Sequence, residues 1–174
     1  TTDGKWAAAV GSTLQQNMVL IYRRDDGPEG AWALWTILPA SVMNDTLQGV
    51  VLKLRGGRLA LVSPGTGTAK IFRPGPDGAA DRQWVQEAAL DQLPSDPLNL
   101  GLPFDFDGES LVFAPSPERL VFANRGAGDW TGRQHVDIPG GWISRGLLAM
   151  SQDRLAVTLN APLSATVRFL ERVG

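Results

Sequence analysis

The chain has 174 residues and a formal net charge of −2, from 16 basic and 18 acidic residues. This balance excludes the strongly basic surface that binds nucleic acid, and no apolar run reaches the about 18 residues that span a bilayer. The lack of cysteine excludes disulfides, thiolate metal sites and cysteine nucleophiles.

Short apolar segments bounded by Gly, Pro, Asp or Asn follow one another along the chain, and this pattern predicts β-strands. In chain order these segments cover residues 4–10, 19–23, 32–38, 49–54, 57–62, 69–73, 84–90, 101–106, 110–113, 120–122, 130–136, 146–150, 153–157 and 166–169. Residues 85–93 contain helix formers, but the aligned segment 33–38 does not, so we interpret this region as a strand too. The expected fold class is all-β.

The same landmarks return at intervals of 46 to 52 residues. Tryptophan at 32, 84 and 130 is followed six residues later by an aliphatic residue. Earlier in each unit an aromatic residue occurs, at 22, 72, 122 and 169. Because the order of the landmarks is fixed, they divide the chain, one domain of residues 1–174, into repeat units of about 4–47, 48–99, 100–144 and 145–174.

Four short antiparallel strands in each unit are typical of the blades of a β-propeller. A single blade has two apolar faces and cannot bury them alone. The repeat therefore predicts blades that stack on one another on both faces.

The repeat unit resembles the FG-GAP repeat, the blade of integrin-α-type propellers and of many bacterial surface proteins. A glycine opens each unit at Gln48-Gly49, Leu100-Gly101 and Arg145-Gly146, where the family has Phe-Gly. The Gly-Ala-Pro element of the family corresponds to Val62-Ser63-Pro64 and Phe113-Ala114-Pro115. The resemblance implies that each of these glycines opens the innermost strand of a blade. It also implies an extracellular, cell-surface or periplasmic protein.

If each of these glycines starts a new blade, successive blades have three, four, four and three strands, which makes about three and a half blades in this chain. The seven four-stranded blades usual in the family need twice as many strands, so we expect a partial propeller, half of a seven-bladed one. A second polypeptide, or the remaining part of the precursor, would supply a first strand to the N-terminal blade and a fourth strand to the C-terminal blade. The chain starts with Thr, so we expect a removed leader or a longer parent chain.

Asp105 and Asp107, followed by Gly108, look like the start of a calcium loop. Calcium needs about six to eight oxygen ligands, and the aligned segments 53–57 and 151–153 lack the acidic pair. We therefore favour a hairpin turn at Asp107-Gly108, with calcium at Asp105 and Asp107 as the alternative and no other cofactor expected.

Trp142 follows Pro139-Gly-Gly141 on a connecting segment and is the candidate for an exposed partner contact. His135, the only histidine, has no neighbour that suggests catalysis or metal binding, so an exposed strand position is expected. Acidic residues recur near strand ends as Asp107, Asp129 and Asp153.

These observations favour a non-catalytic scaffold that binds a protein or a glycan through loops on one rim of the propeller. The alternative is an enzyme with carboxylates on the rim, for which Asp107, Asp129 and Asp153 are the candidates. A third possibility is a purely structural role, as one processed half of a larger surface assembly.

Overall fold

The computed structural model describes residues 1–12, 17–26, 29–43, 50–63, 67–76, 83–91, 103–116, 118–127, 129–130, 132–138, 143–151, 154–161 and 164–171. Over these residues the fold is all-β. Fourteen strands form four antiparallel sheets of three or four strands, and one short 3-10 turn, η1 (Ala40–Met43), follows the first sheet.

Each sheet is a meander, in which strands that follow one another in sequence are hydrogen-bonded neighbours. Sheet 1 contains β1 (Trp6–Ser12), β2 (Asn17–Arg24) and β3 (Trp32–Pro39). Sheet 2 contains β4 (Val51–Arg55), β5 (Arg58–Ser63), β6 (Thr68–Pro74) and β7 (Trp84–Leu90). Sheet 3 contains β8 (Phe104–Phe106), β9 (Ser110–Ser116), β10 (Arg119–Asn124) and β11 (Gly132–Asp137). Sheet 4 contains β12 (Ile143–Ser151), β13 (Arg154–Ala161) and β14 (Ser164–Glu171).

The predicted strands are confirmed, because each of the fourteen expected segments overlaps one observed strand. The expected grouping into three, four, four and three strands is observed as well. A helix was the competing interpretation for residues 85–93; residues 85–90 belong to β7, the fourth strand of sheet 2, and residues 92–93 lie outside the described residues.

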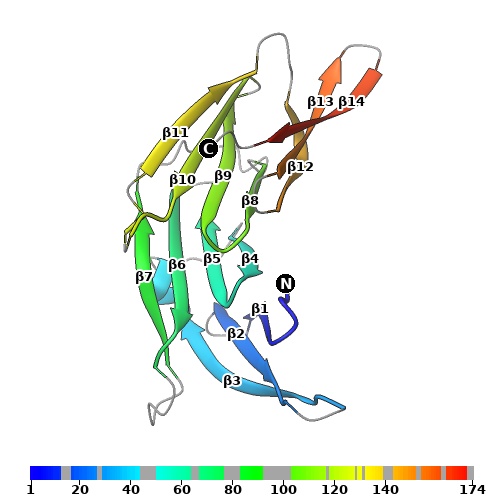
Figure 1. Ribbon diagram of the computed structural model, residues 1–174. Coiled ribbons are helices and arrows are strands. Elements are labelled where there is room, and N and C mark those ends of the chain that lie inside the picture. Colours follow the sequence, from blue (N-terminus) through cyan, green and yellow to red (C-terminus); the bar gives the residue numbers. More distant parts are fainter. Residues whose placement is uncertain are drawn as a thin grey trace.

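The sheets follow one another in chain order, from sheet 1 at the bottom of Figure 1 to sheet 4 at its upper right. The strands that come first in chain order in each sheet, β1, β4, β8 and β12, are neighbours in succession, although β1 corresponds to β5, the second strand of sheet 2, because β3 corresponds to β7. At the other edges of their sheets, β7 and β11 lie on the left in Figure 1. Successive sheets therefore approach most closely along their first strands.

An apolar cluster fills each of the three spaces between successive sheets. The first cluster lies between sheets 1 and 2, the second between sheets 2 and 3, and the third between sheets 3 and 4. The alternating residues of β5 show how one strand serves two clusters: Leu59 and Leu61 belong to the first, and Ala60 and Val62 to the second. Because both faces are buried, β5 is a nearly continuous apolar run, and each fully buried leucine stabilises the fold by about 1.5–3 kcal/mol.

The recurring aromatic residues do not all occupy one structural position. Phe72 pairs with Leu59 in sheet 2, but the corresponding partner of Leu111 in sheet 3 is Ala123. Phe122 is thus shifted by one residue and contacts the third cluster, on the face opposite to that of Phe72. A register shift in β10, between Arg119 and Val121, accompanies the change. A slip of one residue moves a side chain to the other face of a sheet, and spacing in the sequence does not reveal it.

Candidate functional site

Asp107 shapes the turn between β8 and β9, as the hairpin interpretation predicted. Its Oδ1 accepts hydrogen bonds from the backbone N–H groups of Glu109 (2.8 Å) and Ser110 (2.7 Å). Gly108 has a φ of +102°, a conformation that favours glycine. The carboxylate therefore has a structural use within its own turn.

The same turn occurs in sheet 1 at Asp3-Gly4, where Asp3 Oδ1 accepts a hydrogen bond from the backbone N–H of Trp6 at 2.9 Å. The second oxygen of Asp3 accepts from the backbone N–H of Gly57, in the turn of the next sheet, at 2.8 Å. In sheet 2, Arg55 pairs with Arg58 across Gly56-Gly57, so Gly56 occupies the place of Gly4 and Gly108 in this turn. The Asp-Gly dipeptide occurs in the turns of sheets 1 and 3, and Arg55-Gly56 replaces it in sheet 2.

Asp105 links the first strands of three sheets. Its Oδ1 lies 3.0 Å from Lys53 Nζ on β4, and its Oδ2 accepts a hydrogen bond from the backbone N–H of Met150 on β12 at 2.7 Å. Thr1 makes a similar contact between sheets 1 and 2. Its Oγ1 accepts a hydrogen bond from the backbone N–H of Leu54, on β4, at 3.1 Å. Asp105 thus connects neighbouring sheets and is separated in role from Asp107.

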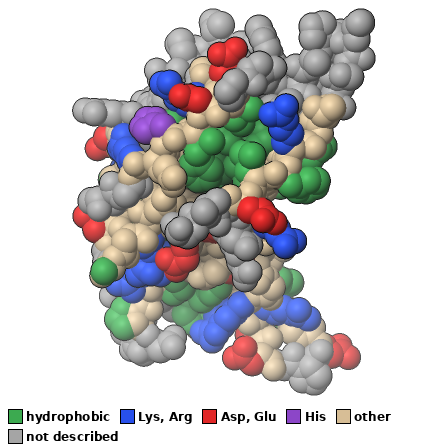
Figure 2. All heavy atoms as spheres, turned by 45° about the horizontal axis from the view of Figure 1, so that its top comes forward, with side chains coloured by type: hydrophobic (Ala, Val, Ile, Leu, Met, Phe, Trp, Pro, Cys, Tyr) green, Lys and Arg blue, Asp and Glu red, His purple; other side chains and the backbone are tan. Residues whose placement is uncertain are grey.

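Within the described part of the chain, no group of three or more acidic, histidine or cysteine side chains is placed to hold a metal ion. Asp129 is exposed, and its Oδ1 accepts a hydrogen bond from the backbone N–H of Trp130 at 2.6 Å. His135 is exposed on β11 and is purple in Figure 2. Trp142 and Asp153 lie outside the described residues.

Four charged side chains missed by the sequence analysis connect sheets 2 and 3. In this ionic cluster, Arg58 contacts Glu87 (Nε–Oε2, 2.8 Å) and Glu109 (Nη1–Oε1, 2.9 Å). Arg125 contacts the same two carboxylates, Glu87 at 3.0 Å and Glu109 at 3.3 Å. The side chains of Glu87 and Arg58 are only 10% and 17% exposed, so water screens these pairs less than surface pairs. No spacing rule in the sequence brings residues 58, 87, 109 and 125 together.

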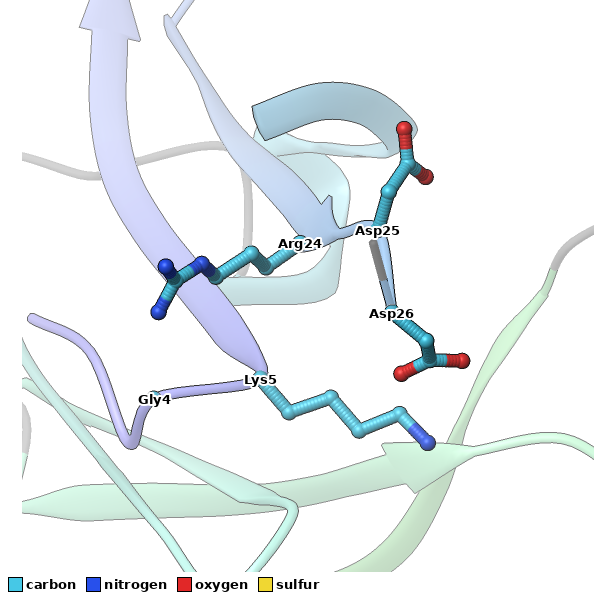
Figure 3. Close-up of a pocket in the computed structure, with 5 residues that line it drawn as sticks. All are labelled: Gly4, Lys5, Arg24, Asp25 and Asp26. Carbon is cyan, nitrogen blue, oxygen red and sulfur yellow. The ribbon is translucent and has the colours of Figure 1, made fainter. Parts of the chain in front are cut away.

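A shallow hollow of about 330 Å³ lies beside the first turn of sheet 1 and is lined by Gly4, Lys5, Arg24, Asp25 and Asp26. Figure 3 shows the side chains of Lys5 and Asp26 extending to the same side, while that of Arg24 points away from them. Arg24 Nε donates to the carbonyl of Gly30 at 3.2 Å, and Asp26 forms a 3.9 Å ion pair with Arg23. The lining mixes both signs of charge, as does the whole face in Figure 2.

The outer face of sheet 1 exposes apolar side chains where the corresponding face of sheet 2 is buried. Trp32 and Trp84 are the first residues of β3 and β7, paired with Arg24 and Pro74. Trp84 is 5% exposed and packs edge-on against Trp6 of sheet 1, with ring centroids 5.2 Å apart. Trp32 is 44% exposed.

We define the N-terminal end face as Leu20, Tyr22, Trp32, Leu34 and Ile37 and the C-terminal end face as Val167 and Phe169. These residues point away from the first and third clusters, respectively. Phe169 is 75% exposed. Both ends of the stack of sheets are therefore apolar surfaces.

The outer strands of the two end sheets differ in how their edges are paired. In sheet 4, β13 is the only strand of the described chain that pairs with β14. In sheet 1, the edge of β1 is partly paired by the first residues of the chain, since Thr2 bridges Ala7 and the Thr1 carbonyl accepts from Ala8 N–H at 2.9 Å. An added strand would meet a free edge on β14 and a partly occupied edge on β1.

No helix in the described part of the chain is long and apolar enough to cross a membrane. No protein-family model matches the sequence, and no curated protein does either. One similar solved structure is described as the complex of KlAtg21 with the coiled-coil of AgAtg16, with a TM-score of 0.46 and 8% identity. The match covers 98% of this chain and 59% of that chain. A similarity this low does not assign the chain to a family.

Proposed function

We propose that the chain is part of a β-propeller of the FG-GAP type and serves as a non-catalytic scaffold for binding a protein or a glycan. Another chain, or another segment of the same precursor, completes the ring of blades. The proposed location is extracellular, at the cell surface or in the periplasm, and it rests on the family resemblance.

The observation that carries the proposal is the contrast between Trp84, 5% exposed, and Trp32, 44% exposed, at the same position of successive sheets. Sheets 2 and 3 have a neighbour on each face, whereas sheets 1 and 4 each have one on a single face. Exposed apolar patches of this kind on a stacked repeat favour further sheets against both end faces.

The free edge of β14 supports the same completion. In sheets 2 and 3 a fourth strand pairs with β6 and β10, and β14 is the third strand of sheet 4. An unpaired strand edge next to an apolar face is a template for association with another strand. We expect that strand to come from the completing chain or segment.

The test is to produce the chain alone and measure its state of association and its binding of the dye ANS. We expect self-association and strong ANS fluorescence, because both end faces lack their partners. A variant with Trp32→Ser, Leu34→Ser and Phe169→Ser should keep its β-sheet circular dichroism and lose most of both signals. A monodisperse monomer that binds no ANS would argue against completion by further blades.

A structure of the completed assembly tests the ring itself. The four sheets should then surround an axis, with β4, β8 and β12 innermost and with new sheets covering Trp32 and Phe169. Sheets closed on themselves as a sandwich would contradict the propeller.

A further inference from the structure

Next to the β4–β5 and β8–β9 turns, equivalent strands and turns enclose a space between successive sheets. The two spaces are filled differently. Between sheets 2 and 3, the ionic cluster fills the space with Glu109, from the β8–β9 turn, and Arg125, which follows β10. The equivalent positions between sheets 1 and 2 are Gly57, in the β4–β5 turn, and Pro74, at the end of β6. A missing side chain and a short one leave room that the next interface does not have.

This room is a hollow of about 440 Å³ between sheets 1 and 2, within the range of about 300–1,000 Å³ typical of small-ligand sites. We call it the inter-sheet hollow; its lining residues are Lys5, Trp6, Gly56, Gly57, Arg58, Arg73, Pro74, Gly75 and Pro76. The two prolines give it apolar walls above the buried Trp6, and the glycines keep backbone within reach of a ligand.

Two cations of the hollow lack a carboxylate partner among the described residues. Lys5 and Arg73 are exposed, form no ion pair there, and Arg73 only donates to the neighbouring Pro74 carbonyl at 3.4 Å. The third cation, Arg58, is engaged by Glu87 and Glu109. Asp26 shares the adjacent hollow with Lys5 and is paired with Arg23.

Among the described residues, the positions equivalent to Glu87 and Glu109 carry no acidic side chain here, and the carboxylate that does reach this interface, Asp3, accepts a hydrogen bond from the backbone N–H of Gly57 at 2.8 Å. Glu109 corresponds to Gly57, and Glu87, the extra residue at the bulge of β7, corresponds to Trp35 at the bulge of β3. Trp35 packs against Trp6, with ring centroids 5.6 Å apart. The described lining of the hollow therefore contains three cations and two prolines and no acidic side chain, unlike the next interface, where Glu87 and Glu109 pair with the arginines.

We infer that the inter-sheet hollow binds an acidic saccharide, a sugar unit carrying a carboxylate. The Arg73 guanidinium can take the carboxylate in a planar, two-bond geometry, and the Lys5 ammonium adds a point charge from the opposite sheet. Pro74 and Pro76, half-buried and exposed respectively, offer apolar surface to the C–H groups of the sugar ring. The inference deepens the glycan-binding form of the proposed function, and it does not depend on which chain completes the ring.

The test is isothermal titration calorimetry of the full chain with tri-galacturonate at low ionic strength. Binding should be measurable with tri-galacturonate and absent with maltotriose, a neutral trisaccharide of similar size. Arg73→Gln and Lys5→Gln should each weaken the affinity about tenfold, the factor expected for the loss of one charge-assisted contact. Arg168→Gln, on exposed β14, removes one positive charge elsewhere and should leave the affinity unchanged.

Equal affinities for all three variants would overturn the inference, as would a complete lack of binding. Tetraglutamate that binds as tightly as tri-galacturonate would also overturn it, since the hollow would then recognise charge and not a sugar. The circular dichroism spectra of Arg73→Gln and Lys5→Gln must match that of the unmodified chain, which separates lost binding from lost fold. None of these variants touches either end face, so failure here is distinguishable from failure of the proposed completion.

Discussion

Sheet 1 and sheet 2 are built from equivalent strands, yet sheet 2 is buried on both faces and sheet 1 on only one. Trp84 and Trp32 open equivalent strands, and Trp6 covers the first while nothing in the described chain covers the second to the same degree. The comparison teaches that the neighbouring sheet, and not the residue type, determines burial in this fold. Tryptophans at equivalent positions of two sheets are therefore expected to contribute differently to the free energy of unfolding.

The largest expected difference in stability is between alanine substitutions of these two tryptophans. Trp84→Ala should lower the free energy of unfolding by about 3–5 kcal/mol, because it leaves a cavity in the first cluster. Trp32→Ala should lower it by about 1 kcal/mol or less in the isolated chain, as for other exposed side chains. Urea denaturation of both variants measures the difference. Equal losses would mean that Trp32 is already covered, for example by self-association.

A second prediction concerns the contacts between first strands. Asp105→Ala should destabilise the chain by about 1–3 kcal/mol, because the backbone N–H of Met150 loses its acceptor and Lys53 its partner. Asp105→Asn keeps an acceptor oxygen and should cost less. Thermal unfolding of the two variants checks the order, and a larger loss for Asp105→Asn would show that charge, and not the hydrogen bond to sheet 4, is decisive.

A third prediction compares equivalent turns of sheets 2 and 3. A Cβ at Gly108, where φ is +102°, would lie 3.0 Å from the carbonyl oxygen of Arg55, whereas a Cβ at Gly57, where φ is +68°, would meet nothing within 4 Å. Gly57→Ala should cost about 1–2 kcal/mol for its backbone conformation alone, and Gly108→Ala should cost more. Chemical denaturation ranks the two variants. Equal costs would show that the turn of sheet 2 moves to relieve the crowding.

The smallest expected effect is at the surface of sheet 3, where Arg119 Nε and Asp137 Oδ1 lie 2.7 Å apart. The hydrogen bond from Arg119, with its positive charge, lowers the pKa of Asp137, and the same pair raises the pKa of Arg119. A lowered carboxyl pKa means that this contribution to stability is present above the unfolded-state value of about 3.9 and is lost as the pH falls through the folded-state pKa.

Carboxyl titration by NMR should therefore show the pKa of Asp137 rising toward its ordinary value in Arg119→Gln. Because both side chains of the pair are exposed to solvent, the unfolding transition itself should barely move. An unchanged Asp137 pKa in the variant would exclude the ion pair in solution.

The strands and their grouping into sheets could be predicted from the sequence, because alternation and turn residues are local signals. Asp107-Gly108 is an example, since the dipeptide alone indicates the hairpin that the structure contains. The shift of Phe122 could not be predicted, because it depends on pairing with Leu111 and Val112 of another strand. The ionic cluster could not be predicted for the same reason, since Glu87 and Glu109 reach Arg58 together only after sheets 2 and 3 have packed.

The distribution of the apolar clusters has a consequence for how the chain tolerates shortening. Each cluster is shared by two successive sheets, and within the described residues no cluster joins sheets that are distant in sequence. Removing β12 to β14 would eliminate the third cluster while leaving the other two whole. Stability should then decline in steps, one interface at a time, as in modular solenoids whose units interact only with their nearest neighbours.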